Sequence, residues 1–160
     1  MAERDSFEAY VHAREAALLR TAYLLTGSHH DAEDLVQTAL MKVVPKWGRI
    51  KDDPDAYVRR VLVNENISRW RGRRWREISR AELPDEAIVT GEDHSDLRDG
   101  LQALAPRQRV VIVLRYFEAL TEHQTAEVLG IAVGTVKSQT RDALARLRAA
   151  LPEAGATAPP

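Results

Sequence analysis

Cysteine is absent from this 160-residue chain, and so are long apolar runs. Without cysteine, the chain can form neither a disulfide framework nor a thiolate metal site. No apolar run reaches membrane-spanning length, and the N-terminus, "MAERDSFEAYVHAREAALLR", lacks the uninterrupted apolar segment of a secretion signal. Hydrophobic residues still make up 44% of the sequence, which is enough to build a core. We therefore expect a cytoplasmic protein that does not insert into membranes.

Catalytic and metal-binding constellations are also missing. His29 and His30 are adjacent, so on a helix they diverge by about 100° and cannot share a metal as an i, i+4 pair does. His12, His94 and His123 have no partners at ligand spacing, and no glycine-rich phosphate loop occurs. This pattern predicts a protein that is not an enzyme, with no metal, no cofactor and no small-molecule substrate.

The formal net charge of −1 hides two blocks of opposite sign. The basic block contains Arg59, Arg60, Arg69, Arg71, Arg73, Arg74, Arg76 and Arg80, and the acidic block that follows contains Glu82, Asp85, Glu86, Glu92, Asp93, Asp96 and Asp99. Such blocks are typical of interaction surfaces. Charge alone leaves a second interpretation open, in which two solvated faces balance each other.

The apolar pattern is helical nearly throughout, with no convincing alternation of period two. It predicts an all-α fold of two small helical domains, at 1–77 and 99–151. Between them, the acidic stretch 78–98 is predicted to be a flexible linker, because it contains proline and glycine and loses the helical period. The tail 152–160 is small, proline-rich and predicted to be disordered.

Local signals place the ends of the first helices. Gly27 ends the first helix, and Ser28 with Asp31 can cap the second, which Pro45 then disturbs. The stretch "WGRIKDDPDA" is predicted as a loop, followed by a helix over about 57–71. In the second domain, "RVVIVLRYF" predicts a buried helix up to Phe117.

The stretch "VLGIAVGTVKSQTRDALARLR" predicts a sharp bend between two helices. Thr121 and Gln124 have the spacing of a capping box for a short helix that Gly130 ends, and a second helix begins near Val133. The core face of this second helix holds Val133, Val136, Thr140, Ala143, Leu144 and Leu147, and its opposite face holds Gly134, Thr135, Lys137, Ser138 and Arg141. This pattern favours a DNA-reading helix-turn-helix over a plain helical hairpin. Ala132 stands where a Ser or Thr cap is usual.

Three segments, in this order, resemble the extracytoplasmic-function sigma factors, the smallest class of bacterial RNA polymerase specificity subunits. They are "DAEDLVQTALMKV", "DAYVRRVLVNENISRWRGRR" and "LTEHQTAEVLGIAVGTVKSQTRDALARLR". The resemblance covers nearly the whole chain, and "YVRRVLVNE" and "VGTVKSQ" are most similar to the actinobacterial SigE-like subgroup. It implies a sigma factor that binds RNA polymerase core and directs promoter-specific initiation of transcription, with a sigma-2-like domain at 1–77 and a sigma-4-like domain at 99–151.

The resemblance also implies a role for each segment. The face implied to dock on polymerase core, at the coiled coil of the largest subunit, comprises Asp31, Glu33, Asp34, Gln37, Thr38 and Met41; the polymerase flap is a further implied contact. The residues implied to recognise and melt the minus-10 element are Asn64, which matches the position that holds a flipped base, Trp47, Arg59, Arg60, Arg69, Arg71, Arg73 and Arg74. The residues implied to read the minus-35 element are Thr135, Lys137, Ser138, Gln139 and Arg141. The acidic linker would thread the RNA-exit path, or serve only as a spacer.

Some questions stay open on the sequence alone. Trp47 and Trp75 are either stacking platforms or core residues, whereas Trp70 is expected to be mainly structural. The predicted helix over 57–71 is either packed on two sides or bent near Asn64, because its apolar residues fall on both of its sides. An anti-sigma factor is a partner that the resemblance allows and the residues do not identify.

Two other classes of function also remain. A free-standing regulator would bind duplex DNA without polymerase, as a dimer on a palindrome. A helical interaction module would bind an acidic protein or RNA and ignore both polymerase and DNA sequence. The ordered match of three segments favours the sigma factor over both.

Overall fold

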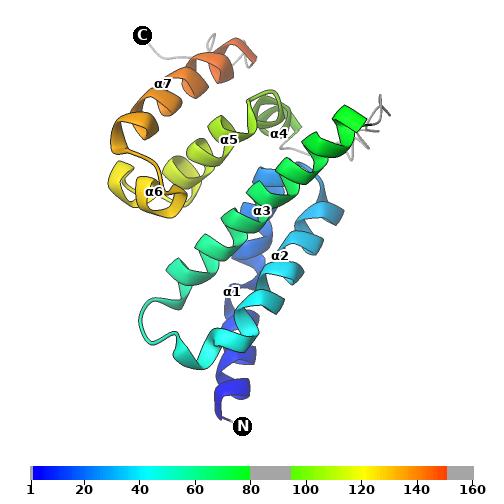
Figure 1. Cartoon of the computed structure of the whole chain (residues 1–160), viewed down its shortest axis with the longest axis vertical. Coiled ribbons are helices and arrows are strands. Elements are labelled where there is room, and N and C mark those ends of the chain that lie inside the picture. Colours follow the sequence, from blue (N-terminus) through cyan, green and yellow to red (C-terminus); the bar gives the residue numbers. More distant parts are fainter. Residues whose placement is uncertain (1, 80–94, 151–160) are drawn as a thin grey trace.

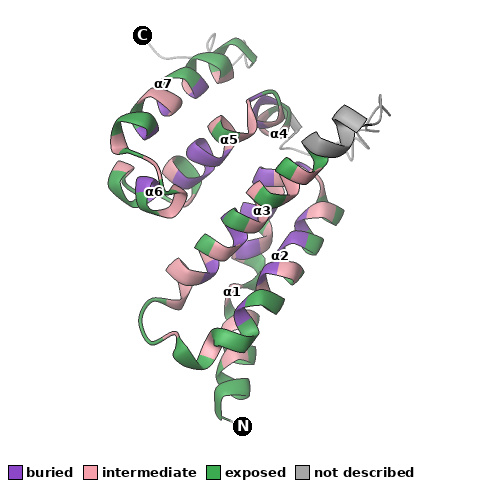
Figure 2. Cartoon of the chain, viewed as in Figure 1, coloured by how far each residue is buried: buried purple, intermediate pink, exposed green. Residues whose placement is uncertain are grey.

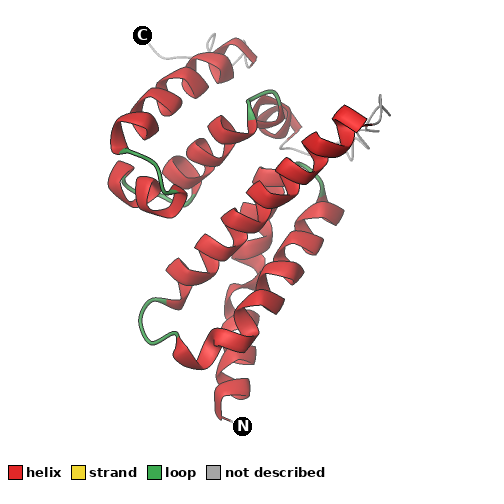
Figure 3. Ribbon diagram, in the orientation of Figure 1, coloured by secondary structure: helices red, strands yellow, loops and turns green. Residues whose placement is uncertain are grey.

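The computed structural model describes residues 2–79 and 95–150, and every regular element in these ranges is a helix (Figure 3). The elements are α1 (Ala2–Thr26), α2 (His29–Val43), η1 (Val44–Arg49), α3 (Pro54–Ser79), α4 (Ser95–Gln102), α5 (Pro106–Ile112), η2 (Val113–Phe117), α6 (Glu122–Leu129) and α7 (Val133–Ala150). The predicted all-α fold is confirmed over these ranges. Among the described helices, none is long and apolar enough to cross a bilayer.

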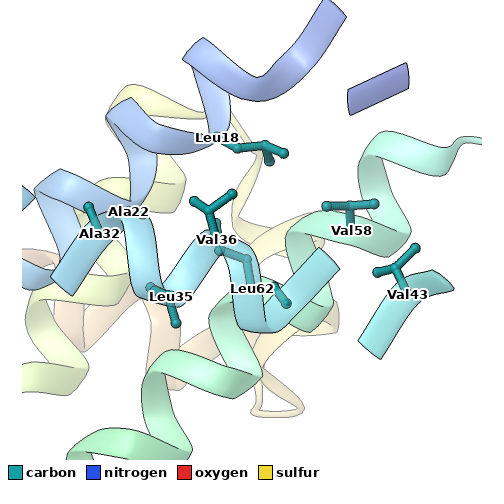
Figure 4. Packing of buried hydrophobic residues seen from close by; sticks show 9 residues of the cluster. Leu18, Ala22, Ala32, Leu35, Val36, Val43, Val58 and Leu62 are labelled. Atoms are coloured by element: carbon teal, nitrogen blue, oxygen red, sulfur yellow. The ribbon is translucent and has the colours of Figure 1, made fainter. Parts of the chain in front are cut away.

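Helices α1, α2 and α3 form the first half of the molecule, and α4 to α7 form the second half beside it (Figure 1). The first half is held by an apolar core in which each helix contributes a stripe of side chains spaced three or four residues apart (Figure 4). Its buried members are Leu18, Ala22, Ala32, Leu35, Val36, Ala39, Val43, Val58 and Leu62. Full burial of one such leucine or valine contributes about 1.5–3 kcal/mol. This core fixes the outward faces of α2 and α3 relative to each other.

The turn between α1 and α2 follows the sequence signals. Gly27 has a φ of +77°, in the left-handed region that glycine adopts without strain, and its N–H donates to the Tyr23 carbonyl at 2.7 Å. Ser28 Oγ then accepts the Asp31 N–H at 3.2 Å. The predicted helix end at Gly27 and the predicted cap at Ser28 are both confirmed.

The segment after α2 is more regular than predicted. Pro45 has no N–H to continue α2, so the backbone tightens into a 3₁₀ helix, η1, up to Arg49. The prediction that the loop begins at Trp47 is therefore wrong, and only residues 50–53 separate η1 from α3. Asp53 Oδ1 accepts the Ala56 N–H at 3.1 Å, which caps α3. Helix α3 extends beyond the predicted range 57–71 at both ends.

The second half packs around α5. Leu101 and Leu104 meet Ile112 and Ala143 on one side of α5, and a smaller apolar cluster joins α5 to α6 and α7 on the other side. Helix α4 begins at Ser95, inside the range 78–98 predicted as a linker. The reason is apolar spacing, because Leu97 lies one turn before Leu101 and packs on the same cluster. The rest of that range after Ser79, and the predicted tail at 152–160, lie outside the described residues.

The end of the predicted helix "RVVIVLRYF" is a π turn, η2. The Glu118 N–H donates to the Val113 carbonyl at 2.9 Å, one residue further back than in an α-helix. Ala119 follows with a φ of +57°, and the Leu120 N–H donates to the Leu114 carbonyl at 2.9 Å. The turn buries Val113 and Leu114 and positions Glu118 against the first half.

The two halves share an apolar core. Leu25 of α1 and Val63 of α3 are buried in one cluster with residues of the second half. Those residues are Val110, Val113, Leu114 and Leu120. Figure 2 shows buried residues on both α3 and α5. The sequence did not predict this contact between the halves.

Candidate nucleic-acid interface

Helices α6 and α7 form the predicted helix-turn-helix. Thr121 and Gln124 cap α6 reciprocally, at 2.8 and 3.0 Å, and Gly130 ends it with a φ of +67°. The Ile131 N–H then donates to the Ala126 carbonyl at 3.1 Å, and α7 begins at Val133. The capping box, the left-handed glycine and the bend are therefore confirmed.

Helix α7 presents one polar face. Val136, Thr140 and Ala143 are buried against the second half, whereas Lys137 and Arg141 are exposed on the opposite side. The Arg141 side chain is 77% exposed, and its neighbour Asp142 lies 3.9 Å away, too far for a strong hydrogen bond. This geometry leaves two cations free to approach a groove.

The other predicted minus-35 residues differ in accessibility. Thr135 is exposed, while Ser138 and Gln139 are half-buried. Ser138 Oγ donates to the Thr135 carbonyl at 3.1 Å, so this hydroxyl is already engaged with the helix backbone. Ala132 precedes α7, and its carbonyl accepts the Val136 N–H at 3.1 Å. Because its methyl group cannot accept a hydrogen bond, Ala132 provides no side-chain cap.

Helix α3 is packed on two sides. Val58 and Leu62 face the core of the first half, and Val63 with Ile67 faces the second half. This answers the question left open by the sequence, because two-sided packing accounts for both apolar stripes on one continuous helix. Asn64 lies on the remaining exposed face.

The arginines of α3 have different surroundings. Arg60 and Arg71 are exposed, and the Arg74 side chain lies outside the described residues. Arg59 Nε contacts Glu118 Oε1 of the second half at 3.0 Å, and both side chains are about one-fifth exposed. Arg73 approaches Asp31 of α2 at 3.5 Å.

Arg69 joins the predicted DNA-binding face to the predicted polymerase-docking face. It contacts Asp34 Oδ2 at 2.9 Å and donates to Thr38 Oγ1 at 2.8 Å. Sequence reasoning missed Glu65, which contacts Arg69 at 3.4 Å and accepts a hydrogen bond from Lys42 Nζ of α2 at 2.5 Å. The hydrogen bond from Lys42 is the main reason that the pKa of Glu65 lies below its usual value, against the opposing effect of burial. The i, i+4 spacing of Glu65 and Arg69 was a signal in the sequence.

The outward face of α2 carries the remaining predicted docking residues. Glu33, Asp34 and Gln37 are exposed, and Met41 is 67% exposed. Asp31 and Thr38 are half-buried and contact the arginines of α3. The face therefore combines acidic and amide groups with one apolar residue.

Trp47 lies in an aromatic cluster with α1. Its ring meets Phe7 edge-on, with centroids 5.3 Å apart, and Tyr10 at 5.1 Å. Its Nε1 donates to Ser6 Oγ at 3.4 Å. These contacts give the half-buried indole a structural role that orders η1. Nearby, burial is the largest cause that raises the pKa of Tyr10, followed by its hydrogen bond to Asp55 at 2.8 Å.

No cluster of three or more potential metal ligands occurs in the described ranges, 2–79 and 95–150. Among the described helices, α2, α3 and α7 present the exposed carboxylates, amides and guanidinium groups predicted to make contacts. Such an arrangement suits contacts to a protein partner on α2 and to nucleic acid on α3 and α7.

Comparison with known proteins gives concordant matches. Residues 10–76 match the model of sigma-70 region 2, and residues 100–149 match that of sigma-70 region 4. The RNA polymerase sigma-E factor of Streptomyces avermitilis is 45% identical over 148 residues, covering 89% of this chain and 83% of that protein. The ECF RNA polymerase sigma factor SigL of Mycobacterium tuberculosis is 32% identical, covering 98% of this chain and 94% of that protein.

A solved structure is similar over both halves. It is the co-crystal structure of the sigma factor RpoE with the anti-sigma factor NepR from Bartonella quintana. The TM-score is 0.77 at 29% identity, covering 91% of this chain and 96% of that chain.

Proposed function

The chain belongs to the extracytoplasmic-function sigma factors of RNA polymerase, and on that premise we propose which surface carries out each step. It is not an enzyme: it binds RNA polymerase core and promoter DNA and directs promoter-specific initiation of transcription. Family membership decides against the free-standing regulator and the interaction module. The assignment of surfaces rests on the two faces of α7. This helix buries Val136 and Ala143 and exposes Lys137 and Arg141 on the opposite face.

We assign reading of the minus-35 element to the exposed face of α7. With the bend at Gly130, the N-terminal half of α7 can enter a major groove. Lys137 and Arg141 would donate to phosphates or guanine edges, with Thr135 beside them. Ser138 and Gln139 are assigned to the edge of the same DNA contact, because both residues are half-buried and less accessible than Lys137 and Arg141.

We assign melting of the minus-10 element to the exposed face of α3. Taking one base out of the stack costs a few kcal/mol, so a protein group must bind the base edge in return. The Asn64 amide has both a donor and an acceptor and is exposed on α3. Arg60 and Arg71, which are also exposed, would bind the adjacent phosphates.

We assign polymerase docking to α2. Glu33, Asp34 and Gln37, with Met41, offer an acidic and amide face with one apolar contact, which suits a basic helical partner. The coiled coil of the largest polymerase subunit is the proposed partner there, and the flap is the proposed partner of the second half. Because polymerase and its template are in the cytoplasm of a bacterium, we place this chain there as well.

Inhibition by a protein partner is a further proposal. The similar sigma factor RpoE of Bartonella quintana was crystallised with the anti-sigma factor NepR. Because the similarity extends over both halves of this chain, we propose that an anti-sigma factor controls this chain too. A pull-down from the native host with this chain as bait, in which a co-purified protein abolishes transcription by holoenzyme, would support it; unchanged transcription would count against it.

The direct test is transcription in vitro with purified bacterial core polymerase and a genomic promoter library. Discrete start sites that need both core and this chain are expected, and they would reveal the promoter sequence. In the same assay, Arg141→Ala should weaken use of a minus-35 element by about 1–3 kcal/mol, if Arg141 reads a base. Arg148→Ala is the matched control, since Arg148 is exposed near the end of the same helix. Equal losses in both variants would remove the specific role of Arg141.

A further inference from the structure

The contact between the two halves is built from three kinds of interaction. The first is the shared apolar cluster, in which Leu25 and Val63 of the first half are buried with Leu114 of the second half. Val128 and Leu129 of α6 pack against the same cluster. The helix-turn-helix is thus placed directly beside α3, the helix that we assign to the minus-10 element.

Guanidinium groups provide the second interaction. The last turn of α1 contains no basic residue. The carbonyl groups at this end of the helix therefore need hydrogen-bond donors from elsewhere in the molecule. Arg98 Nε donates to the Gly27 carbonyl at 2.6 Å, and Arg109 donates to the Leu25 carbonyl at 3.3 Å. Arg109 also donates to the Leu101 carbonyl at 2.9 Å. Two arginines of the second half therefore cap the C-terminal end of α1.

Glu118 provides the third interaction. Its carboxylate accepts hydrogen bonds from Arg59 Nε, at 3.0 Å, and from Thr21 Oγ1. Both Arg59 and Glu118 are about four-fifths buried, so this ion pair is shielded from solvent. Arg59 is one of the arginines predicted to bind promoter phosphates, and in the docked arrangement its guanidinium is paired with the Glu118 carboxylate instead.

This docked arrangement conflicts with reading both promoter elements at once. Elements named minus-10 and minus-35 are roughly 25 base pairs apart, or about 85 Å at 3.4 Å per base pair. Helix α7 has 18 residues and is only about 27 Å long at 1.5 Å per residue. With α6 packed on α3, the two reading faces cannot be separated by the distance that the promoter requires.

We propose that the docked halves are a closed, autoinhibited state of the free sigma factor, held by the Glu118–Arg59 contact, the caps on α1 and the shared cluster. Opening would separate α6 from α3 and free Arg59 for DNA. This proposal rests on the proposed function, because it is the promoter spacing that makes the docked state inactive.

The absence of cysteine allows a direct test in the free chain. Spin labels at Arg20→Cys and Arg148→Cys, both exposed positions, report the distance between the halves by pulsed electron paramagnetic resonance. One narrow distribution is expected for the otherwise unchanged chain. Glu118→Arg, which places two cations together, should shift a large fraction of the molecules to longer distances and broaden the distribution.

Three controls keep the distance measurement decisive. Glu127→Arg makes the same charge change at an exposed position of α6 and should leave the distribution narrow. Arg59→Glu combined with Glu118→Arg reverses the pair and should restore the short distance. Glu118→Gln is a milder variant if Glu118→Arg fails to fold by circular dichroism. A broad distribution in the starting protein, or no response to either Glu118 variant, would overturn the closed state.

Transcription in vitro tests whether the closed state is inactive. Thr21→Cys and Glu118→Cys, joined by a short reducible bis-methanethiosulfonate, lock the halves together. The locked chain should not initiate transcription with core polymerase, and reduction should restore initiation. If one free molecule in ten is open, Glu118→Arg should lower the concentration for half-maximal transcription about tenfold. Equal transcription by locked and reduced chains would disprove the inhibition. If no form initiates transcription, the proposed function fails, and the distance measurement still decides whether the halves dock.

Discussion

At the scale of single residues, one carboxylate organises the boundary between α2 and α3. Glu65 is only 11% exposed and contacts Lys42 and Arg69. Because Arg69 also contacts Asp34 and Thr38, Glu65 helps to fix the guanidinium that connects the proposed docking face to the proposed DNA face. Its charge is therefore important for stability and for the placement of both faces.

The stability contributed by Glu65 should depend on pH. Its pKa is lowered in the folded state, mainly by the hydrogen bond from Lys42, so the stabilisation is full above the unfolded pKa of about 4.3 and is lost as the pH falls through the lower folded value. Urea unfolding at pH 7 should show Glu65→Gln less stable by about 0.5–1 kcal/mol, since Lys42 is largely exposed. At pH 3 the difference in the free energy of unfolding between the two proteins should be smaller. An equal difference at pH 7 and pH 3 would argue against an ionic role for Glu65.

Asn64 should affect promoter opening and not core binding. Asn64→Ala removes the amide proposed to hold the flipped base, so we expect slower open-complex formation by about 10-fold, as for 1.4 kcal/mol of lost base contact. Permanganate footprinting of the melted strand measures opening, and gel filtration with core polymerase measures docking. Asn66→Ala is the matched control, because it deletes the same amide on another side of α3. If wild type and Asn64→Ala open promoters equally, the assignment of Asn64 fails.

At the scale of elements, caps and turns could be predicted because their signals are local. Ser28 with Asp31, Thr121 with Gln124, and Gly130 each act over a few residues, and all three features were found. The π turn could not be predicted, since it depends on how Val113 and Leu114 fit a core formed by distant helices. The start of α4 at Ser95 was missed because acidic residues obscured the apolar spacing that includes Leu97.

Two glycines of the helix-turn-helix provide a matched test of backbone conformation. An added Cβ would meet nothing within 4 Å at either Gly130 or Gly134, so only the backbone differs between the two sites. Gly130 has a φ of +67°, and Gly130→Ala should destabilise the chain by about 1–2 kcal/mol. Gly134 lies inside α7, and Gly134→Ala should stabilise the chain by up to about 1 kcal/mol. Thermal unfolding followed by circular dichroism measures both; equal signs would refute the argument.

At the scale of the whole molecule, the shared cluster should couple the unfolding of the two halves. All three tryptophans, Trp47, Trp70 and Trp75, lie in the first half, so their fluorescence reports that half, and amide exchange in α7 reports the other. We expect coincident urea transitions in the starting protein. Val63→Ala removes about 1–3 kcal/mol of packing between the halves and should separate the two transitions.

Val58→Ala provides the control for this coupling. Val58 is buried in the core of the first half alone, so the same loss of two methyl groups should destabilise the first half without weakening its contact with the second. If Val58→Ala separates the transitions as much as Val63→Ala does, the shared cluster is not what couples them.

The sequence could not predict that the halves dock. It showed that Val63 and Ile67 face away from Val58 and Leu62, but periodicity within one helix does not identify what covers a second stripe. The contact of Arg59 with Glu118 joins residues far apart in the chain, and nothing local marks them as partners. The exposed positions assigned to α2 and α7 were predictable, because one amphipathic helix is enough to define them.

The arginines of α3 that contact α2 also affect the salt dependence of DNA binding. Arg69 lies 2.9 Å from Asp34, and Arg73 lies 3.5 Å from Asp31, so these carboxylates act as resident counterions. A phosphate that binds either arginine would leave an unpaired aspartate beside the DNA, so less net positive charge would neutralise phosphates and the free chain should show a shallow salt dependence for DNA binding. Once a basic polymerase surface occupies the acids of α2, the same arginines would meet DNA with their full charge. The polymerase would then act on DNA affinity by exchanging one ion partner for another.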